Sequence, residues 1–326
     1  MAPILLYTGY HAWRESNMLT PNQRTLRRNA RCIGIGLHSG QPVSMEIRPA
    51  AAGHGIVFER ADEGGRTIRA LAGNVLHTRY QTTLSENGTT VATTEHLLSA
   101  LYALGIDNAL IEIEGAEVPI LDGSAAPFLF MLREAGIQDL AAARRVVVIE
   151  EPVSVVEDGC SIEIEPAAGL AVAYGVDYRH PVVGGQRYIG PLDLRTYAEE
   201  IAPARTFCFL REVEALRRQG LALGGSLDNA VVVGDDGVLN ESLRFPDEFV
   251  RHKVLDLVGD LALLGAGLVG HVRAERAGHR LHTRLVQEIL ERRGAWSLRP
   301  APRASESAPA PALQPVAASS TLAAAL

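Results

Sequence analysis

The stretch FVRHKVLDLVGDLALLG, residues 249–265, carries a histidine and two aspartates in an otherwise largely apolar segment. His252, Asp256 and Asp260 are spaced four residues apart, which places them along one side of a helix. Because Phe, Val and Leu occupy most of the remaining positions, this helix is expected to be buried. A buried charged group must be paired, hydrogen-bonded or bound to a metal. A histidine and an aspartate one turn apart can share a metal ion, and they can equally make an ordinary hydrogen bond in the core.

A second histidine opens a similar segment in the first half of the chain. TTEHLLSALYALG, residues 93–105, predicts a helix with Thr93 or Thr94 as its cap and a glycine at its end. Glu95 suits the positive end of this helix dipole, and His96 beside it can be read as a satisfied polar group of the first turn. Neither residue indicates a catalytic site when it is taken alone.

The order of elements repeats between the two halves. SMEIRPAAAG at 44–53 is similar to SIEIEPAAG at 161–169, and both alternate as strands do. In each half a helix, a strand and a helix follow, and a glycine closes each helix. These segments are 93–105, 108–115 and 125–136 in the first half, and 247–265, 268–278 and 282–294 in the second.

This duplication predicts an α+β fold of two similar domains, each a mainly antiparallel sheet with helices on one face. If the two helix layers face each other, the histidine of the first half meets the stripe of the second. The result is a set of two histidines and one carboxylate, typical of a catalytic zinc site: His96, His252 and Asp256.

The predicted organisation has five parts. They are an N-terminal extension at 1–22, a first domain at 23–143, a second domain at 144–298, an insertion within it at about 207–226, and a tail at 299–326. The tail is rich in Pro, Ala and Ser and is expected to be disordered, because it has too few core-forming residues to offset its ordering entropy. Met18 is an alternative start.

Composition narrows the class of protein. The net charge is -7 with no cluster of basic residues, which argues against nucleic acid as a partner. The three cysteines are far apart and favour a reducing compartment. No apolar run reaches the ~18 residues of a membrane span. The sequence therefore predicts a cytoplasmic protein, and it gives no sign of an obligate oligomer, so a monomer is expected.

Several long motifs occur in a fixed order over about residues 23–298. They are TTEHLLSALYALGIDNALIEIEG, EVPILDGSAAPF, ARTFCFLREVEALRRQGLALGGSLDNAVVV, LRFPDEFVRHKVLDLVGDLALLG and AGHRL. Together they resemble the UDP-3-O-acyl-N-acetylglucosamine deacetylases, the zinc amidases of lipid A synthesis in Gram-negative bacteria. The resemblance implies two domains with their helices sandwiched between outer sheets. It also implies hydrolysis of the 2-acetamido group of UDP-3-O-(3-hydroxyacyl)-N-acetylglucosamine, with release of acetate.

The resemblance carries roles over to matching positions. One zinc ion would be bound by His96, His252 and Asp256, and Glu95 matches the general base. Three residues match the groups that stabilise the oxyanion or protonate the leaving amine: Thr206, Lys253 and His279. Asp260 matches the partner that orients His279 and keeps it charged.

The insertion matches a segment that forms a passage for the acyl chain. The candidate substrate-binding residues are His38, Phe207, Leu210, Val213, Leu227 and Arg276. Arg144 and Arg145, together with Arg276, are candidate diphosphate partners. The chain departs from the family pattern in two places: Leu227 stands where an aromatic residue is common, and RYQTTLS replaces a Cys-rich stretch before the first ligand motif.

The sequence alone is also compatible with other interpretations. His279 follows a glycine, so it is expected in a loop, where it can face a cleft, lie on the surface or cap a helix. A zinc hydrolase of the same fold that acts on a different N-acyl sugar is one alternative function. A non-catalytic protein that binds a UDP-linked lipid is another, although such a protein would be expected to lack catalytic side chains that this sequence retains.

Overall fold

The structure is a computed structural model that describes residues 18–301. Its two halves build sheets of the same topology. The first sheet has the order β2 (Ala30–Ile35), β3 (Pro42–Pro49), β9 (Ala109–Glu114), β4 (Ile56–Arg60) and β5 (Arg66–Arg69). The corresponding strands of the second sheet are β12 (Val153–Glu157), β13 (Cys160–Glu165), β18 (Gly267–Glu275), β14 (Leu170–Asp177) and β15 (Gly185–Pro191).

The pairing directions also repeat. In both sheets the third and fourth strands, β9 with β4 and β18 with β14, run parallel, and the other three pairings are antiparallel. The two repeated sequence segments form β3 and β13, which hold the same second position in their sheets. The predicted duplication and the α+β class are confirmed.

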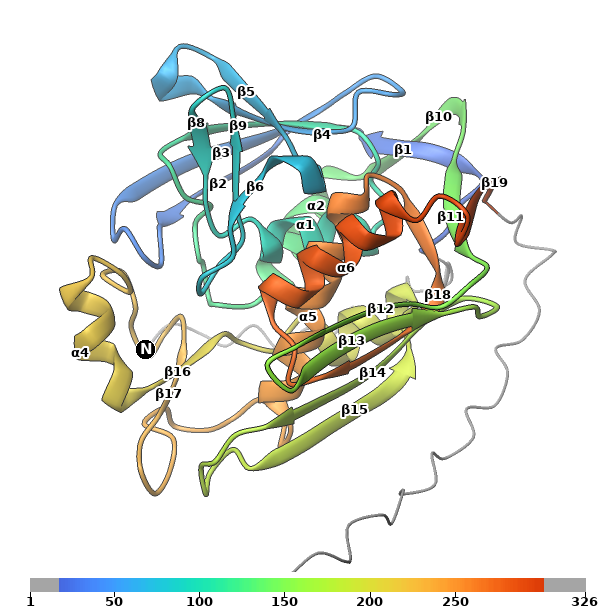
Figure 1. The fold of residues 1–326 in the computed structure, drawn as a ribbon. Helices are drawn as coiled ribbons and strands as arrows, with labels where there is room; N and C mark the ends of the chain where they lie inside the picture. Colours follow the sequence, from blue (N-terminus) through green and yellow to red (C-terminus); the bar gives the residue numbers. More distant parts are fainter. Residues whose placement is uncertain (1–17, 302–326) are drawn as a thin grey trace, which may run out of the picture.

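Four helices lie between the two sheets (Figure 1). They are α1 (Glu95–Ala103) and α2 (Ala126–Ala135) on either side of β9 in the sequence, and α5 (Glu248–Leu261) and α6 (His279–Glu291) on either side of β18. Helix α1 packs against α5, so the helix layers of the two halves meet. Every residue of α1 and nearly every residue of α5 is buried, as expected for helices that are covered on all sides.

A glycine permits the close approach of α1 and α5. A Cβ atom added to Gly259 on α5 would lie 2.1 Å from the carbonyl oxygen of Glu95 on α1. No real Cβ atom tolerates that separation, so the absence of a side chain at Gly259 sets how near the two helices come. The same contact brings the first turn of α1 to the polar stripe of α5.

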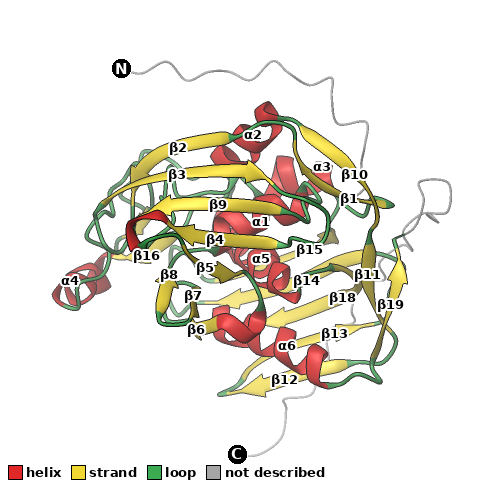
Figure 2. Cartoon of the chain, turned by 90° about the horizontal axis from the view of Figure 1, so that it is seen from above, coloured by secondary structure: helices red, strands yellow, loops and turns green. Residues whose placement is uncertain are grey.

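Further strands extend this duplicated frame (Figure 2). β1 (Asn22–Leu26) pairs with β10 (Ile137–Ala143), and β11 (Arg145–Ile149) lies between β18 and β19 (Trp296–Pro300). A small sheet of β6 (Val75–His77), β7 (Thr83–Glu86) and β8 (Thr89–Val91) directly precedes α1. The chain passes from the first half to the second between β10 and β11.

The predicted insertion forms a separate β–α–β unit that protrudes beside the two sheets (Figure 1). β16 (Phe207–Phe209) leads into α4 (Leu210–Arg218), and β17 (Val231–Val233) returns parallel to β16. The unit therefore continues beyond residue 226. Ahead of it, α3 (Leu194–Thr196) runs into a π-helical turn at Tyr197–Ile201.

Residues near both ends of the described chain pack on its body. Met18, in the segment predicted as an extension, is 4% exposed, and its carbonyl accepts a hydrogen bond from Arg144 at 2.5 Å. In the segment predicted as a tail, β19 reaches Pro300 and Ala301 is buried. The rest of the predicted extension and tail, 1–17 and 302–326, lies outside the described residues. Within 18–301, no helix is long and apolar enough to cross a membrane.

Candidate active site

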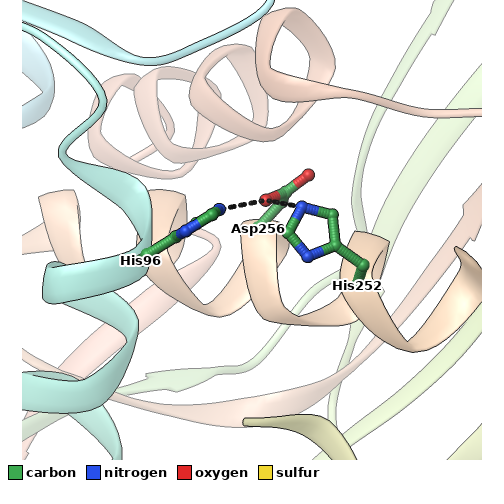
Figure 3. A group of neighbouring side chains, drawn as sticks. All are labelled: His96, His252 and Asp256. Carbon is green, nitrogen blue, oxygen red and sulfur yellow. Dashed lines mark ion pairs between the residues drawn. The ribbon is translucent and has the colours of Figure 1, made fainter. Parts of the chain in front are cut away.

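Two residues of the polar stripe of α5 lie beside the histidine in the first turn of α1 (Figure 3). His252 and Asp256 come from α5 and His96 from α1, and all three are almost completely buried. Oδ1 of Asp256 lies 3.3 Å from Nε2 of His252 and 3.7 Å from Nε2 of His96. The two imidazole rings pack edge to face with their centroids 5.1 Å apart. The structure thus brings together the three residues that the duplication predicted would meet.

The hydrogen bonds of these residues do not use the atoms that point toward one another, so these atoms are available to bind a metal ion. Nδ1 of His252 lies 3.1 Å from the carbonyl oxygen of Ala204, which accepts its proton and leaves the Nε2 lone pair available. Oδ1 of Asp256 is buried and has no hydrogen-bond partner among the described residues. The candidate ligand atoms of His96, His252 and Asp256 all lie within 4.8 Å of one another.

The charge states also suit a cation. Burial, followed by the neighbouring His252, lowers the pKa of His96 to about 3. Burial likewise lowers the pKa of His252, so both imidazoles are neutral near pH 7. Burial alone would raise the pKa of Asp256, but the positive charges of Lys253 and His279 outweigh it and hold that pKa well below its usual range. Two neutral imidazoles and an ionised carboxylate oxygen without a donor form a metal-binding set, because a cation satisfies all three.

Lys253 binds the other oxygen of the same carboxylate. Its Nζ donates to Oδ2 of Asp256 at 2.7 Å and lies 5.7 Å from the ring centroid of Phe207. Burial lowers the pKa of Lys253, but the Asp256 carboxylate outweighs this effect and raises it, so the ammonium stays charged. The cation is therefore fixed at the edge of the metal-binding set.

Glu95 and His279 flank Asp256 on the other side. Oε2 of Glu95 accepts a hydrogen bond from the backbone of Thr82 at 3.0 Å, and its Oε1 lies 3.9 Å from Nε2 of His279. The same Nε2 is 3.7 Å from Oδ2 of Asp256. Burial raises the pKa of Glu95 to about 7. Burial alone would lower the pKa of His279, but Asp260, Asp256 and Glu95 outweigh it and raise it to about 9. The pair thus offers a carboxylate that can accept a proton beside an imidazolium that can donate one.

His279 is the first residue of α6, so the prediction of a loop position was wrong. Its Nδ1 donates to Oδ2 of Asp260 at 2.8 Å, as the resemblance implied. Three residues around this pair were not predicted from the sequence: Thr82, Tyr174 and His282. A signal existed for His282, because it follows His279 by three residues on the same face of a helix. Thr82 precedes a short strand and Tyr174 lies in mid-strand, and neither position carries a pattern that points to the site.

The sequence predicted a threonine cap, but neither Thr93 nor Thr94 caps α1 with a side-chain hydrogen bond. Thr94 holds the N-cap position, but its hydroxyl bonds to the carbonyl oxygen of Thr82 at 3.2 Å instead of to the helix. The hydroxyl of Thr93 bonds to Gln81 and to Glu117. Thr93 has a φ of 55°, an uncommon conformation for a β-branched residue. Both threonines tie the segment before Glu95 to neighbouring loops, and this helps to place the first turn of α1.

Two adjoining cavities reach the site. One, of about 200 Å³, is lined by residues that include Glu95, His96, Thr206, His252, Lys253, Asp256 and His279; we call it the site cavity. The other, of about 330 Å³, is lined mainly by apolar residues of the β16–α4–β17 unit, among them Leu210, Val213 and Leu227; we call it the insertion cavity. His38, Thr206 and Phe207 line both, so the two cavities adjoin at these residues.

The position of Thr206 follows from a buried ion pair. Arg205 donates through its backbone N–H and its guanidinium to Glu248 in the first turn of α5, with the Nε–Oε1 distance at 2.8 Å. The backbone of Thr206 then bonds to Gly123 and Val231. These contacts fix the start of β16 against α5, and Thr206 lines the site cavity, as Lys253 does.

The predicted diphosphate arginines lie elsewhere. Arg144 is buried, binds Asp107 at 2.7 Å and is not among the described residues that line the site cavity or the insertion cavity, so its role toward the diphosphate stays a prediction. Arg145 is exposed and donates to the carbonyl oxygen of Leu298. Arg276 bonds to the carbonyl oxygen of Gly159 and is not among the described residues that line either cavity.

Comparison with known proteins agrees with this geometry. Residues 23–291 match the family described as UDP-3-O-acyl N-acetylglycosamine deacetylase. The chain is 46% identical over 278 residues to the UDP-3-O-acyl-N-acetylglucosamine deacetylase of Geotalea uraniireducens, covering 85% of this chain and 91% of that protein. It is 50% identical over 278 residues to the enzyme of that name from Acidithiobacillus ferrooxidans (84% and 91%), and 46% identical over 284 residues to the one from Myxococcus xanthus (86% and 90%). The chain therefore belongs to the UDP-3-O-acyl-N-acetylglucosamine deacetylase family.

Proposed function

We propose that this chain hydrolyses the 2-acetamido group of UDP-3-O-(3-hydroxyacyl)-N-acetylglucosamine and releases acetate, an early step of lipid A biosynthesis. The observation that carries the proposal is the buried set of His96, His252 and Asp256. Oδ1 of Asp256 has no hydrogen-bond donor among the described residues. A base, an acid and a fixed cation surround this set, and an apolar cavity adjoins it. Membership of the family supports the same reaction.

We propose zinc as the metal, held by His96, His252 and Asp256. Two imidazole nitrogens and one carboxylate oxygen, with a further position open, are typical of catalytic zinc. When bound, the ion would lower the pKa of a water molecule and polarise the amide carbonyl.

The residues around the metal site would transfer the protons and stabilise the charge that develops during the reaction. Glu95 accepts a proton from the attacking water, because its raised pKa makes it a competent base near neutral pH. The amide carbon gains the water oxygen, and Lys253 and Thr206 stabilise the charge that develops on the carbonyl oxygen. Losing one donor of this kind commonly costs ~10²–10³-fold in rate. His279 donates its Nε2 proton to the departing nitrogen as the C–N bond breaks, while Asp260 holds its other nitrogen.

The acyl chain would occupy the insertion cavity. Leu210, Val213 and Leu227 line that cavity, and burial of the chain contributes ~0.8 kcal/mol per CH₂. His38 and Phe207 stand where the two cavities join, so we propose that they contact the sugar and the start of the acyl chain. Nε2 of His38 is buried without a hydrogen-bond partner among the described residues, which leaves it available to a polar group there. Arg276 stays a prediction for the diphosphate.

A direct test measures metal content and acetate release for the wild-type chain and for His252→Ala. We expect about one zinc per wild-type chain, rapid release of acetate from the acylated substrate, and loss of tightly bound zinc in the variant. Full zinc occupancy in His252→Ala would contradict the ligand assignment.

Substrates with and without the 3-O-acyl chain separate this activity from that of a hydrolase for another N-acyl sugar. We expect a clear preference for the acylated substrate. Equal rates on both substrates would show that the insertion cavity does not contribute to recognition of the acyl chain.

A further inference from the structure

The carboxylate of Asp260 is held by three side chains that donate to it. Its Oδ1 accepts from the hydroxyl of Thr82 at 2.6 Å. Its Oδ2 accepts from Nδ1 of His279 at 2.8 Å and from Nδ1 of His282 at 2.9 Å. Asp260 and His282 are fully buried. Because a carboxylate turns readily about its last side-chain bond, its donors decide where each oxygen points.

The ring of His282 is fixed at its far side as well. Its Nε2 lies 2.9 Å from the hydroxyl of Tyr174 on β14, and the two rings pack edge to face. The same hydroxyl bonds to the carbonyl oxygen of Ala277, just before α6, at 2.8 Å. Tyr174 is fully buried. His282 thus spans the distance between a central strand of the second sheet and the carboxylate on α5, and it has little freedom to move.

We propose that His282 is a positioning residue for the deacetylation, acting by fixing the Asp260 carboxylate that aims His279. This inference rests on the proposed function. With Nδ1 of His279 held by Oδ2 of Asp260, its Nε2 points toward Glu95 and Asp256. The aim of Nε2 decides whether its proton reaches the leaving nitrogen.

Removal of His282 would free the carboxylate in a specific way. Oδ2 of Asp260 would keep only His279 as a donor. The Thr82 hydroxyl lies 3.2 Å from Nδ1 of His279 as well as 2.6 Å from Asp260, so Thr82 does not by itself define one arrangement. The carboxylate can then turn, and the imidazole that follows it loses its fixed direction. The loss falls on the chemical step and not on substrate binding, because His282 lines neither cavity.

The test compares His282→Leu with His282→Asn in the zinc-loaded enzyme. The leucine variant lacks the donor, and we expect kcat to fall on the order of 10-fold while KM and zinc content stay unchanged. The asparagine variant can place an amide N–H near the position of Nδ1, so it should recover most of kcat. Equal losses in the two variants, or wild-type kcat in His282→Leu, would overturn the proposal.

His271→Leu is the matched control. His271 also pairs with a carboxylate, Glu165, but it is a partly buried residue of β18 and is not among the residues that line either cavity. We expect wild-type kcat in this variant. A comparable loss there would mean that any disturbed histidine–carboxylate pair lowers activity, and the specific role of His282 would be rejected.

A double-mutant cycle tests whether His282 acts through Asp260. In an Asp260→Ala background, His282→Leu should lower kcat by no more than about 2-fold further, because coupled residues are not additive. A full repeated loss would show that His282 acts by another route. If His282→Leu does not fold, Tyr174→Phe releases the far side of the ring in a variant of nearly the same shape. It should lower kcat at unchanged KM, and an unchanged kcat contradicts the proposal.

The two proposals fail separately. A wild-type enzyme that releases no acetate refutes the proposed function. An active wild-type enzyme whose kcat is indifferent to the donor at position 282 refutes only this inference.

Discussion

Glu95 and His279 lie next to the same buried carboxylate, and their pKa values are shifted in ways that suit opposite tasks. Neither residue belongs to the set formed by His96, His252 and Asp256, which we propose as the zinc ligands. We therefore expect Glu95→Ala and His279→Ala each to retain zinc and to lose most of their turnover, by at least ~10²-fold. Metal analysis beside kcat measures both properties. A variant that loses zinc together with activity would place the altered residue among the ligands.

The pH dependence of the reaction follows from the same two groups. Activity should fall at low pH as Glu95 is protonated and at high pH as His279 loses its proton, which gives a bell-shaped profile of kcat/KM. The two groups are coupled, so each limb belongs to the pair with its metal site and not strictly to one residue.

Asp260→Asn tests the basic limb. Asp260 is the nearest acidic group to Nδ1 of His279, and its negative charge favours the imidazolium. Removing that charge lowers the pKa of His279, so the basic limb should move to lower pH. The measurement is kcat/KM against pH for the variant and the wild type. A basic limb that stays fixed in Asp260→Asn and disappears in another variant would exclude His279 as the acid.

Individual residues could be predicted where a regular spacing or the duplication constrained them. The stripe on α5 followed from the helical period, and His96 followed from the matching helix of the first half. Thr82 and Tyr174 could not be found in this way, because they reach Asp260 and His282 from parts of the chain more than 80 residues away. Long-range contacts of this kind depend on the assembled fold.

At the scale of elements, the helices and sheet strands with a clear period were predicted within a few residues. The small β6–β7–β8 sheet was missed, since its strands are only three or four residues long. The position of His279 shows a related limit: Gly278 indicated a loop, but it stands at the N-cap and α6 begins immediately after it. The glycine showed that the structure changes near residue 278, but it did not show whether a loop or a helix follows.

The close contact between α1 and α5 at Gly259 can be tested by adding a side chain there. Gly259→Ala places a methyl group against the backbone of Glu95, which cannot rotate away. We expect the variant to lose ~1–3 kcal/mol or more of stability and to bind zinc less tightly, because the helices that carry the proposed ligands must separate. Melting temperature and zinc affinity report the two effects.

Gly294→Ala is the control for that substitution. A Cβ atom at Gly294 would meet nothing within 4 Å, and its backbone does not have a positive φ. This variant should match the wild type. Wild-type stability and zinc affinity in Gly259→Ala would show that the two helices can separate without disturbing the site.

Within residues 18–301 there is one main hydrophobic core, although the sequence is duplicated. The principal cluster of buried residues includes Met45 and Leu97 from the first half, and Val172 and Leu257 from the second. The proposed metal ligands also come from both halves, His96 from the first and His252 and Asp256 from the second, so neither half contains the complete set. Sequence similarity revealed the two units, but their joint core depends on side chains from two helix layers that only the assembled structure brings together.

The last described residues, β19 and Ala301, are bound to the second half of the chain. The backbone N–H of Ala301 bonds to the carbonyl oxygen of Arg144 at 3.0 Å, and β19 pairs with β11 up to Pro300. Removal of 304–326, a segment poor in core-forming residues, keeps these contacts, so melting temperature and acetate release should stay nearly unchanged. Removal of 296–326 also deletes β19 and should lower the melting temperature by several degrees, at ~2–4 °C per kcal/mol lost. A large fall after the shorter deletion would show that residues 304–326 contribute to the stability of the folded protein.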